Sequence, residues 1–235
     1  MSFLDKLRGR TSFEESGILR GKKDSHSHIL FGVDDGIKTL ENSLLALQRQ
    51  EEFGLSEVWC TPHIMEDIPN KTVDLQHRFE ELLAAYNGPL KMHLAAEYML
   101  DTNYRARLEA RDLLLLEEDQ VLVETSTRTP PYNFDELIAD TMAAGYRPVL
   151  AHPERYRYME KEKYDELVER GVHLQINLPS LVGFYGESAR DKAQYILSRG
   201  LCSRIGSDCH NPKMFHEAYR RTLLNKKMLK YLAEI

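Results

Sequence analysis

Two hydrophobic patterns alternate along most of this chain. Short runs rich in apolar and β-branched residues predict strands, and longer stretches with apolar side chains every three or four positions predict helices. The predicted strands cover residues 24–28, 57–61, 91–97, 120–124, 147–152, 172–177 and 202–208. The predicted helices cover residues 39–53, 73–86, 134–144, 160–170, 187–199 and 213–232. Glycines follow four of these helices, at positions 54, 145, 171 and 200, where a left-handed C-cap is common.

The order of these elements predicts the fold class. Strands that alternate with helices pair in a mostly parallel sheet, because each helix returns the chain to the same end of the sheet. Seven strand–helix units favour an α/β fold of the TIM-barrel kind with one strand fewer than eight. A doubly wound open sheet has the same order of elements, and periodicity alone does not separate the two folds.

The first 23 residues stand apart from this repeat. Residues 2–10 predict a short amphipathic helix, and glycines at positions 17 and 21 interrupt the pattern after it. No linker rich in proline or serine follows. We therefore expect an N-terminal extension over residues 1–23 and one domain over residues 24–235.

Composition and charge narrow the class of protein. The chain has 235 residues, 42% hydrophobic and 29% charged, which excludes collagen-like and intrinsically disordered chains. A net charge of -6 gives no overall attraction to nucleic acid or anionic lipid. No apolar run approaches the roughly 20 residues of a membrane-spanning helix, and the first 20 residues lack the apolar core of a signal peptide. We therefore expect that this protein has no nucleic-acid partner and is not an integral membrane protein.

The three cysteines, at positions 60, 202 and 209, give no sign of a disulfide framework or a zinc ribbon. Their number is odd and no CxxC occurs, so a reducing cytoplasm is the simplest compartment. Cysteine-dependent tyrosine phosphatases need an arginine six residues after the cysteine. The residues at those places are glutamate, aspartate and phenylalanine, which excludes that chemistry.

Histidines and carboxylates collect at the predicted strand ends. These ends carry His26, His28, His63, Glu97, Glu124, His152, Asp208 and His210, and the loop after the first strand carries Asp34 and Asp35. Catalytic residues of a β/α barrel gather at the C-terminal ends of its strands. Alternation along a strand places Asp24, His26 and His28 on one face, and it also places Asp208 and His210 together.

This set of side chains predicts a metal centre. It offers nitrogen and oxygen ligands without thiolates, which suits zinc, manganese or iron. One ion needs about four to six ligands, so this many candidates predict more than one ion. Each piece alone has an ordinary explanation, because a lone His-x-His is often incidental and a strand-end glutamate can cap a helix. The other four histidines, His77, His93, His173 and His216, are interpreted as ordinary solvated or core residues.

Four short motifs resemble the polymerase-and-histidinol-phosphatase (PHP) superfamily. DSHSH, TPH, AHPER and SDCH occur in that order, with Glu97 between the second and the third. FGVDDG, LVET and AHPERY narrow the resemblance to the bacterial manganese-dependent protein-tyrosine phosphatases of capsule and exopolysaccharide operons, the CpsB/YwqE type. The resemblance covers residues 24–235 and implies a distorted seven-stranded TIM-like barrel of the PHP type.

The resemblance also implies three divalent metal ions, manganese first and iron or zinc as alternatives. His26, His28, Glu97 and Asp208 would hold the first ion, Glu97 with Glu124 and His152 the second, and Asp35, His63 and His210 the third. Asp35 is preferred to Asp34 because it is the second aspartate of VDDG.

The implied activity is hydrolysis of phosphotyrosine on a bacterial tyrosine kinase or its C-terminal tail, which regulates capsule or exopolysaccharide synthesis. A small-molecule phosphatase, such as a histidinol-phosphatase, is the first alternative. Histidinol-phosphatase relatives often have a longer chain and a histidine in place of Asp35. A non-catalytic binding module is the second alternative, and the complete set of ligands argues against it.

Arg155 is the candidate phosphate-binding residue, three positions after His152. Its guanidinium can bind phosphoryl oxygens through two N–H groups, although a surface arginine in a charged turn would look the same. Asp208 and His210 are expected to act beside it in catalysis. The family tends to carry an arginine shortly after SDxH, where this chain has Lys213. Lys213 either replaces that arginine as a point charge, or the second phosphate contact is lost.

Overall fold

Strands and helices alternate along the chain as predicted, in a computed structural model that describes residues 9–221 and 223–235. The central strands are β2 (Lys23–Ser27), β3 (Glu57–Cys60), β4 (His63–Ile64), β5 (Lys91–Leu94), β6 (Glu97–Met99), β7 (Gln120–Glu124), β8 (Arg147–Ala151), β9 (His173–Asn177) and β10 (Cys202–Gly206). The helices are α3 (Leu40–Glu52), α4 (Thr72–Ala85), α5 (Tyr104–Ala110), α6 (Phe134–Ala143), α7 (Lys161–Glu169), α8 (Leu178–Leu181), α9 (Glu187–Ser198), α10 (Pro212–Tyr219) and α11 (Lys226–Ala233), with a 3-10 turn η1 (Pro153–Arg155) after β8. Helix α3 begins where expected, because the Thr39 hydroxyl accepts from the Asn42 N–H at 3.4 Å.

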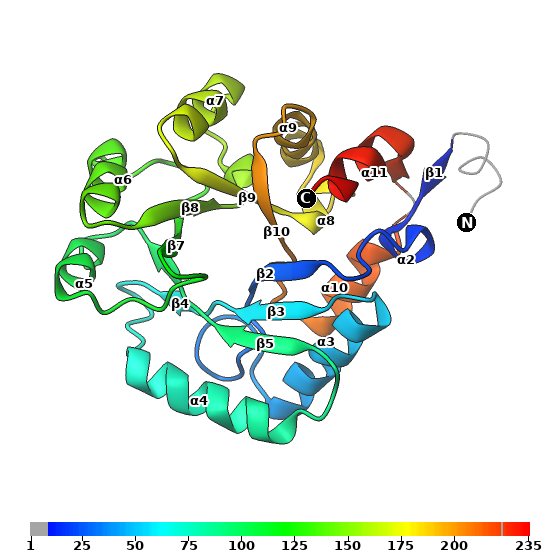
Figure 1. Ribbon diagram of the computed structural model, residues 1–235, viewed down its shortest axis with the longest axis horizontal. Helices are drawn as coiled ribbons and strands as arrows, with labels where there is room; N and C mark the ends of the chain where they lie inside the picture. Colours follow the sequence, from blue (N-terminus) through cyan, green and yellow to red (C-terminus); the bar gives the residue numbers. More distant parts are fainter. Residues whose placement is uncertain (1–8, 222) are drawn as a thin grey trace.

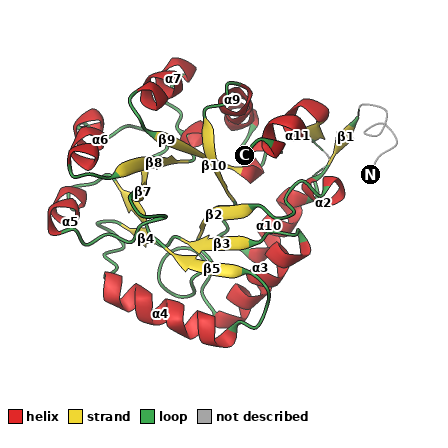
Figure 2. Ribbon diagram, in the orientation of Figure 1, coloured by secondary structure: helices red, strands yellow, loops and turns green. Residues whose placement is uncertain are grey.

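The strands lie around a common centre, and most of the helices pack outside them (Figure 1). Figure 2 shows the same arrangement as an inner ring of strands and an outer layer of helices. Hydrogen bonds join the strands into a six-stranded sheet, in the order β10-β9-β8-β7-β6-β4, and a three-stranded sheet, in the order β2-β3-β5. All neighbouring strands in these two sheets are parallel, so the predicted α/β class is confirmed.

The predicted strand 91–97 is in fact two strands, β5 and β6, which belong to different sheets. The chain makes the same change of sheet between β3 and β4, where Pro62 has no N–H for the ladder. Its carbonyl still accepts from the Glu97 N–H at 3.1 Å. At the opposite seam β2 lies beside β10, joined by an isolated bridge between Ser27 and Cys209. The described strands therefore form two sheets and not one closed ladder, so the seven-stranded barrel is not confirmed.

The predicted helix 213–232 is wrong, because the structure divides it into α10, β11 (Leu224–Asn225) and α11. Asn225 ends the extended segment and starts the new helix, since its side chain accepts from the Met228 N–H at 3.0 Å. Apolar residues continue at helical spacing across the break, which hid it from the hydrophobic pattern. None of the described helices is long and apolar enough to cross a membrane.

The described part of the N-terminal segment packs against the C-terminal part of the chain. Strand β1 (Arg10–Thr11) pairs antiparallel with β11, and the short helix α2 (Phe13–Ser16) buries Phe13. The predicted helix over residues 2–10 lies mostly outside the described residues, and its last residue belongs to β1.

A small apolar cluster lies beneath the C-terminal ends of the strands. It contains Trp59, Ala95, Leu116, Leu122, Val149 and Ala151, apart from the main core between strands and helices. Leu122 and Glu124 lie on the same face of β7, so this cluster lies directly below the carboxylate at the strand end. Trp59 is the largest side chain in this cluster. Its indole N–H donates to the Leu116 carbonyl at 2.8 Å, so its polar group has a partner.

Candidate metal centre

All nine residues that the sequence marked as metal ligands come together at one place. Their nitrogen and oxygen atoms form four overlapping groups, and within each group these atoms lie within 4.8 Å of one another. The groups are His28, Asp35, His63 and His210; His26, His28 and Asp208; His26, Glu97 and His152; and His63, Glu97 and Glu124. The residues come from the C-terminal ends of the strands and the loops that follow them. His26, His28, His63 and Glu97 each belong to two of the groups, so the four groups form one continuous cluster.

Glu97 lies at the middle of this cluster and is fully buried. Its Oε2 atom is 3.2 Å from His26 Nε2, 3.1 Å from His28 Nε2 and 3.1 Å from His63 Nδ1, but it forms no hydrogen bond of acceptable geometry. Short distances without hydrogen-bond geometry mean that the atoms converge on a common point. This arrangement fits a divalent cation, which accepts lone pairs from several directions at once.

Two of the histidines, His26 and His28, are held so that one nitrogen faces the cluster and the other faces a protein acceptor. His26 Nδ1 donates to Gln175 Oε1 at 2.8 Å, and His28 Nδ1 donates to Asp34 Oδ2 at 2.7 Å. A proton on Nδ1 leaves Nε2 free to bind a metal, as is usual for metal-binding histidines. Sequence analysis set Asp34 aside, but the structure gives it this orienting contact, together with a bond from the His63 N–H at 3.0 Å.

Asp35 lies on the open side of the cluster. Its Oδ1 is 3.4 Å from His63 Nε2 and 3.3 Å from His210 Nε2, and its side chain is 63% exposed. The hydrogen bond from His210 is the main cause that lowers the pKa of Asp35 to about 2. The centre is thus closed below by buried residues and open to solvent beside Asp35, which leaves room for a substrate.

Two of the candidate ligands have left-handed backbone conformations. The φ angles are 34° at His152, directly after β8, and 52° at Asp208, two residues after β10. Such conformations are rare for residues other than glycine and persist where the surrounding structure holds them, often at functional sites. Here they turn the chain at the strand end so that both side chains point into the cluster.

The prediction that Asp24 shares a face with the two histidines of β2 is wrong. Asp24 Oδ2 accepts from the Gln50 side chain of α3 at 2.6 Å, and Oδ1 accepts from the Ser207 N–H at 2.8 Å. The register of β2 against β3 shifts between Asp24 and Ser27, so strict alternation does not extend across this bulge. Asp24 joins β2 to the end of β10, and His26 and His28 alone face the metal centre.

Arg155 lies at the edge of the cluster, on η1. Its Nη1 donates to Asp208 Oδ2 at 2.5 Å, and its guanidinium lies 4.4 Å from the ring centroid of Tyr185. Burial disfavours the charge, but the Asp208 carboxylate outweighs it and raises the pKa of Arg155 above its usual range. Arg155 is therefore a fixed cation that stands beside the ligand-bearing residues and is not one of them.

Lys213 is exposed at the start of α10, and its backbone N–H donates to Asn211 Oδ1 at 2.9 Å. It lines a cavity of about 370 Å³ that also contains His210 and Lys38. The Lys38 ammonium donates to the Asp34 carbonyl. Lys38, which sequence analysis passed over, thus brings a second cation to the side of the centre where Lys213 was expected to act.

Strand β9 contributes two polar side chains that sequence analysis missed. Gln175 Nε2 donates to Asn177 Oδ1 at 3.0 Å, and Asn177 Nδ2 donates to Asp208 Oδ2 at 2.7 Å. Because Gln175 also accepts from His26, a buried chain of hydrogen bonds joins one candidate ligand to another. The spacing Gln-x-Asn was the available signal, since alternation along the strand places both amides on one face.

Gln175→Leu should weaken metal binding without unfolding the protein. The change leaves His26 without its Nδ1 acceptor, and loss of such supporting contacts commonly costs about 10- to 100-fold in metal affinity. Titration with Mn²⁺ measures this change, and thermal unfolding checks the fold. Gln76→Leu on the exposed face of α4 is the matched control. Equal affinities in both variants would show that Gln175 does not position His26.

Three histidines of the metal-free centre, His26, His63 and His210, have pKa values raised above the usual value. Burial disfavours their charge, but nearby carboxylates outweigh it and raise the pKa of His26 to about 9 and that of His63 to about 10. Glu97 is the principal carboxylate for both. For His210, the hydrogen bond with Asp35 and the Asp208 carboxylate raise the pKa to about 9.

Metal affinity should therefore rise from about pH 6 to about pH 10, because His26, His63 and His210 must lose their extra protons to bind a metal. The metal-free protein should show the opposite trend. These pKa values exceed the unfolded value of about 6.5, so their contribution to stability is complete below about pH 6.5 and is lost as pH rises through about 9–10. Calorimetric Mn²⁺ titrations and thermal unfolding of chelated protein across this range measure both. A pH-independent affinity would contradict the raised pKa values.

The cysteines cannot replace this chemistry. Cys60 and Cys209 are buried, and burial raises the pKa of each thiol well above its usual value. Burial likewise raises the pKa of Cys202 to about 12. None of the three thiols is ionised near neutral pH, so none is a ready nucleophile.

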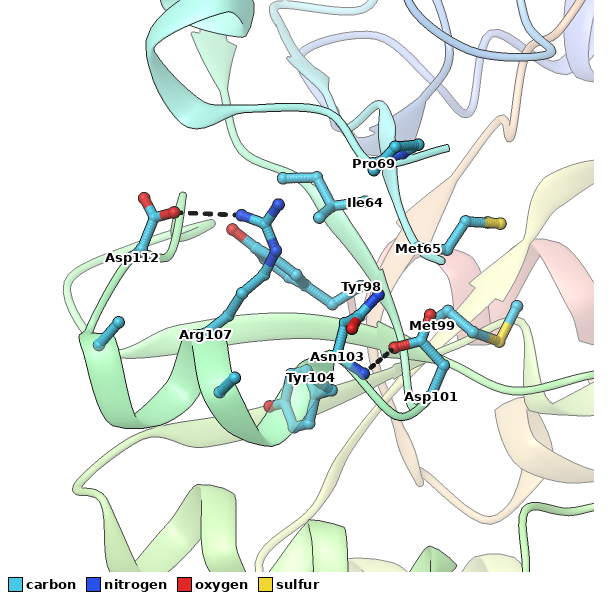
Figure 3. Close-up of a pocket in the computed structure, with 12 residues that line it drawn as sticks. Ile64, Met65, Pro69, Tyr98, Met99, Asp101, Asn103, Tyr104, Arg107 and Asp112 are labelled. Carbon is cyan, nitrogen blue, oxygen red and sulfur yellow. Dashed lines mark hydrogen bonds and ion pairs between the residues drawn. The ribbon is translucent and has the colours of Figure 1, made fainter. Parts of the chain in front are cut away.

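A separate cavity of about 320 Å³ lies on the outer side of β4 and β6, beneath α5 (Figure 3). Ile64 and Tyr98 line it, and both point away from the centre because the preceding residue of each strand points inward. Its arginine is already paired, with Arg107 Nη1 3.1 Å from Asp112 Oδ2. This cavity has no part in the metal centre.

Comparison with known proteins agrees with the geometry. The sequence model described as "Capsular polysaccharide synthesis, CpsB/CapC" matches residues 22–231. The chain belongs to the CpsB/CapC family. The tyrosine-protein phosphatase CpsB of Streptococcus agalactiae serotype V is 30% identical over 221 residues, covering 84% of this chain and 88% of that protein. The tyrosine-protein phosphatase YwqE of Bacillus subtilis is 27% identical over 213 residues, covering 87% of this chain and 84% of that protein.

Solved structures of the CpsB/CapC family share the fold. One structure superposes with a TM-score of 0.76. It comes from a study of YwqE from Bacillus subtilis and CpsB from Streptococcus pneumoniae, which are described there as unique metal-dependent tyrosine phosphatases. It is 26% identical and covers 90% of this chain and 86% of that chain. The histidinol phosphate phosphatase of Lactococcus lactis superposes with a TM-score of 0.54 at 12% identity, covering 91% of this chain and 94% of that chain, which shows a likeness of fold alone.

Proposed function

We propose that this member of the CpsB/CapC family is a metal-dependent phosphatase that hydrolyses phosphotyrosine in proteins. The observation that supports it most is the convergence of nine nitrogen- and oxygen-bearing side chains beside a charged arginine. Its relatives CpsB and YwqE are named tyrosine-protein phosphatases. A phosphomonoester is a dianion, and a site of this kind complements its charge.

The nine side chains would hold three divalent ions, with manganese proposed first and iron or zinc as alternatives. His26, His28, Glu97 and Asp208 would hold one ion, Glu97, Glu124 and His152 the second, and Asp35, His63 and His210 the third. When bound, such ions supply positive charge and lower the pKa of water toward neutrality. The Oε2 atom of buried Glu97 supports this assignment, because it lies within 3.2 Å of three imidazole nitrogens and has no hydrogen-bond partner among the described residues.

The protein groups then orient and neutralise the phosphoryl group. Arg155 would bind its oxygens, held in place by the carboxylate of Asp208. His210 is held by the Asp208 carbonyl at 3.0 Å and faces the open side, where it would contact the substrate. Lys213 would supply a second positive charge from the start of α10.

The proposed physiological substrate is the phosphorylated C-terminal tail of a bacterial tyrosine kinase in the cytoplasm, which regulates capsule or exopolysaccharide synthesis. The description of the family as one of capsular polysaccharide synthesis supports this context. We also propose that residues 24–235 form the catalytic domain, with residues 1–23 as an extension. The two sheets would then be a distorted seven-stranded barrel of the PHP type, opened where β3 and β5 pass into β4 and β6.

Side-by-side turnover of a phosphotyrosine peptide and histidinol phosphate, with Mn²⁺ supplied, tests the substrate class. We expect a much higher kcat/KM for the peptide. A higher value for histidinol phosphate would replace the proposal with a small-molecule phosphatase. Hydrolysis of neither compound, nor of a simple aryl phosphate, by metal-loaded protein would instead favour a non-catalytic binding module.

A further inference from the structure

A cavity of about 220 Å³ beside Arg155 has a positively charged wall that extends beyond the groups used by the proposed reaction. Arg155, Arg157 and Lys192 line it, together with Tyr185. Arg155 and Tyr185 also face the metal centre, because both approach Asp208 Oδ2, at 2.5 Å and 3.5 Å. The cavity and the centre thus share a wall, and a group bound in one is a neighbour of a group bound in the other.

Arg157 is the cation in this wall that lacks a partner. Across the described ranges, its guanidinium forms no hydrogen bond or ion pair, and only its backbone N–H is bonded, to the Thr127 carbonyl at 2.9 Å. Several other surface arginines are paired with carboxylates. Arg147 lies 2.6 Å from Asp119, Arg170 lies 2.5 Å from Asp135, and Arg199 lies 3.1 Å from Asp165. Arg157 therefore keeps its full donor capacity for a ligand.

The loop that carries Arg157 is held by a buried lysine. Lys192 of α9 is 8% exposed, and its ammonium donates to the carbonyls of Tyr156 and Met159, both at 2.8 Å. A buried ammonium needs these partners, so it ties the loop to α9. The wall is preorganised, which lowers the entropic cost of binding a ligand there.

The carboxyl group among the lining residues does not oppose an anion in the cavity. Glu154 is buried, and its Oε1 accepts from the Asn177 N–H at 2.9 Å and from the Ser180 hydroxyl at 2.7 Å. Both of these contacts are with residues of β9 and α8. The charges that face the cavity are those of the two arginines and Lys192.

We propose that this cavity binds an anionic side chain adjacent to the phosphotyrosine of a peptide substrate, through the guanidinium of Arg157. The ligand is an aspartate, a glutamate or a second phosphotyrosine. The inference rests on the proposed function, since it needs the scissile phosphotyrosine at the metal centre. An extended peptide advances about 3.3 Å per residue, so a side chain one or two positions away reaches a site that shares a wall with the centre. The enzyme would then prefer acidic or multiply phosphorylated segments.

A series of phosphotyrosine peptides tests this proposal on the full-length, metal-loaded protein. The peptides differ only in the flanking positions, which are alanine, glutamate, lysine or a second phosphotyrosine. We expect wild-type kcat/KM to be about tenfold higher for the glutamate and doubly phosphorylated peptides than for the alanine peptide, mainly through KM. Arg157→Ala should remove this preference and leave hydrolysis of p-nitrophenyl phosphate unchanged, because that compound has no flanking group.

Two further variants complete the test. Arg20→Ala removes an exposed arginine before β2, at the opposite end of the strands, and should keep the wild-type preference. Arg157→Glu should reverse it and favour the lysine peptide. A preference for only one of the two acidic peptides would identify the ligand as a carboxylate or a phosphoryl group. Equal wild-type rates on the glutamate, doubly phosphorylated and alanine peptides would overturn this inference and leave the proposed function standing. No hydrolysis of any phosphotyrosine peptide would overturn the proposed function and this inference with it.

Discussion

His152→Ala is expected to remove nearly all phosphatase activity together with part of the bound metal. His152 is almost completely buried at the end of β8, and its Nε2 lies 3.0 Å from Glu97 Oε1 and 3.7 Å from Glu124 Oε2. Its removal takes away a proposed metal ligand and leaves two buried carboxylates close together. Removal of one preorganised catalytic group typically lowers kcat by roughly 10²–10³-fold. We expect a larger decrease in kcat for His152→Ala.

Two other histidines serve as controls for this variant. His173 is half-buried at the start of β9, and His77 is exposed on α4. Neither belongs to the metal groups of the described residues, so His173→Ala and His77→Ala should keep kcat and metal content near those of the wild type. The measurements are kcat, metal per chain by elemental analysis, and Tm. Equal, small effects in all three variants would mean that the strand-end residues are not the ligands.

Arg155→Ala should lower kcat/KM about 30-fold to about 900-fold, which corresponds to a loss of ~2–4 kcal/mol of transition-state stabilisation. The metal content should stay unchanged. Its guanidinium is fixed between Asp208 Oδ2 and the ring of Tyr185, so it is preorganised to bind phosphoryl oxygens. Asp208 keeps a hydrogen bond from Asn177 at 2.7 Å in the variant, which should hold it in the metal centre. Inhibition by inorganic phosphate should weaken in parallel.

Arg155→Lys distinguishes charge from geometry at this position. Lysine keeps the positive charge but loses the two-pronged contact, so it should recover only part of the activity. All measurements are made on one preparation of each variant, with Arg20→Ala as the control for loss of an arginine. Wild-type kcat/KM and phosphate Ki in Arg155→Ala would leave Arg155 as an ion-pair partner of Asp208 alone.

The convergence of the candidate ligands was predictable because these residues follow the simplest rule of a parallel α/β fold. Candidate ligands such as Glu124 and His152 come at the ends of consecutive strands, and these ends meet at one edge of the structure. The position of a residue in its strand therefore determined its place in space. The bulge in β2 shows the limit of this rule, since a shifted register moved Asp24 to the helix side.

The supporting residues were harder to predict because their roles depend on tertiary contacts. Gln175, Asn177 and Tyr185 have no sequence spacing that relates them to Asp208, yet all three lie within two hydrogen-bond steps of it. The broken elements have a related cause. The break at Pro62 could be anticipated from its missing N–H, whereas the change from α10 to β11 depends on pairing with β1, far away in the sequence.

Stepwise reloading of metal-free protein tests the central claim most directly. The protein is stripped with a strong chelator, its metal content is verified, and Mn²⁺ is returned in measured amounts while hydrolysis of a phosphotyrosine peptide and bound metal per chain are followed. We predict no activity without metal and a rise that ends near three ions per chain, with the same curve for a variant in which all three cysteines are alanine. Activity that persists in verified metal-free protein would contradict the account.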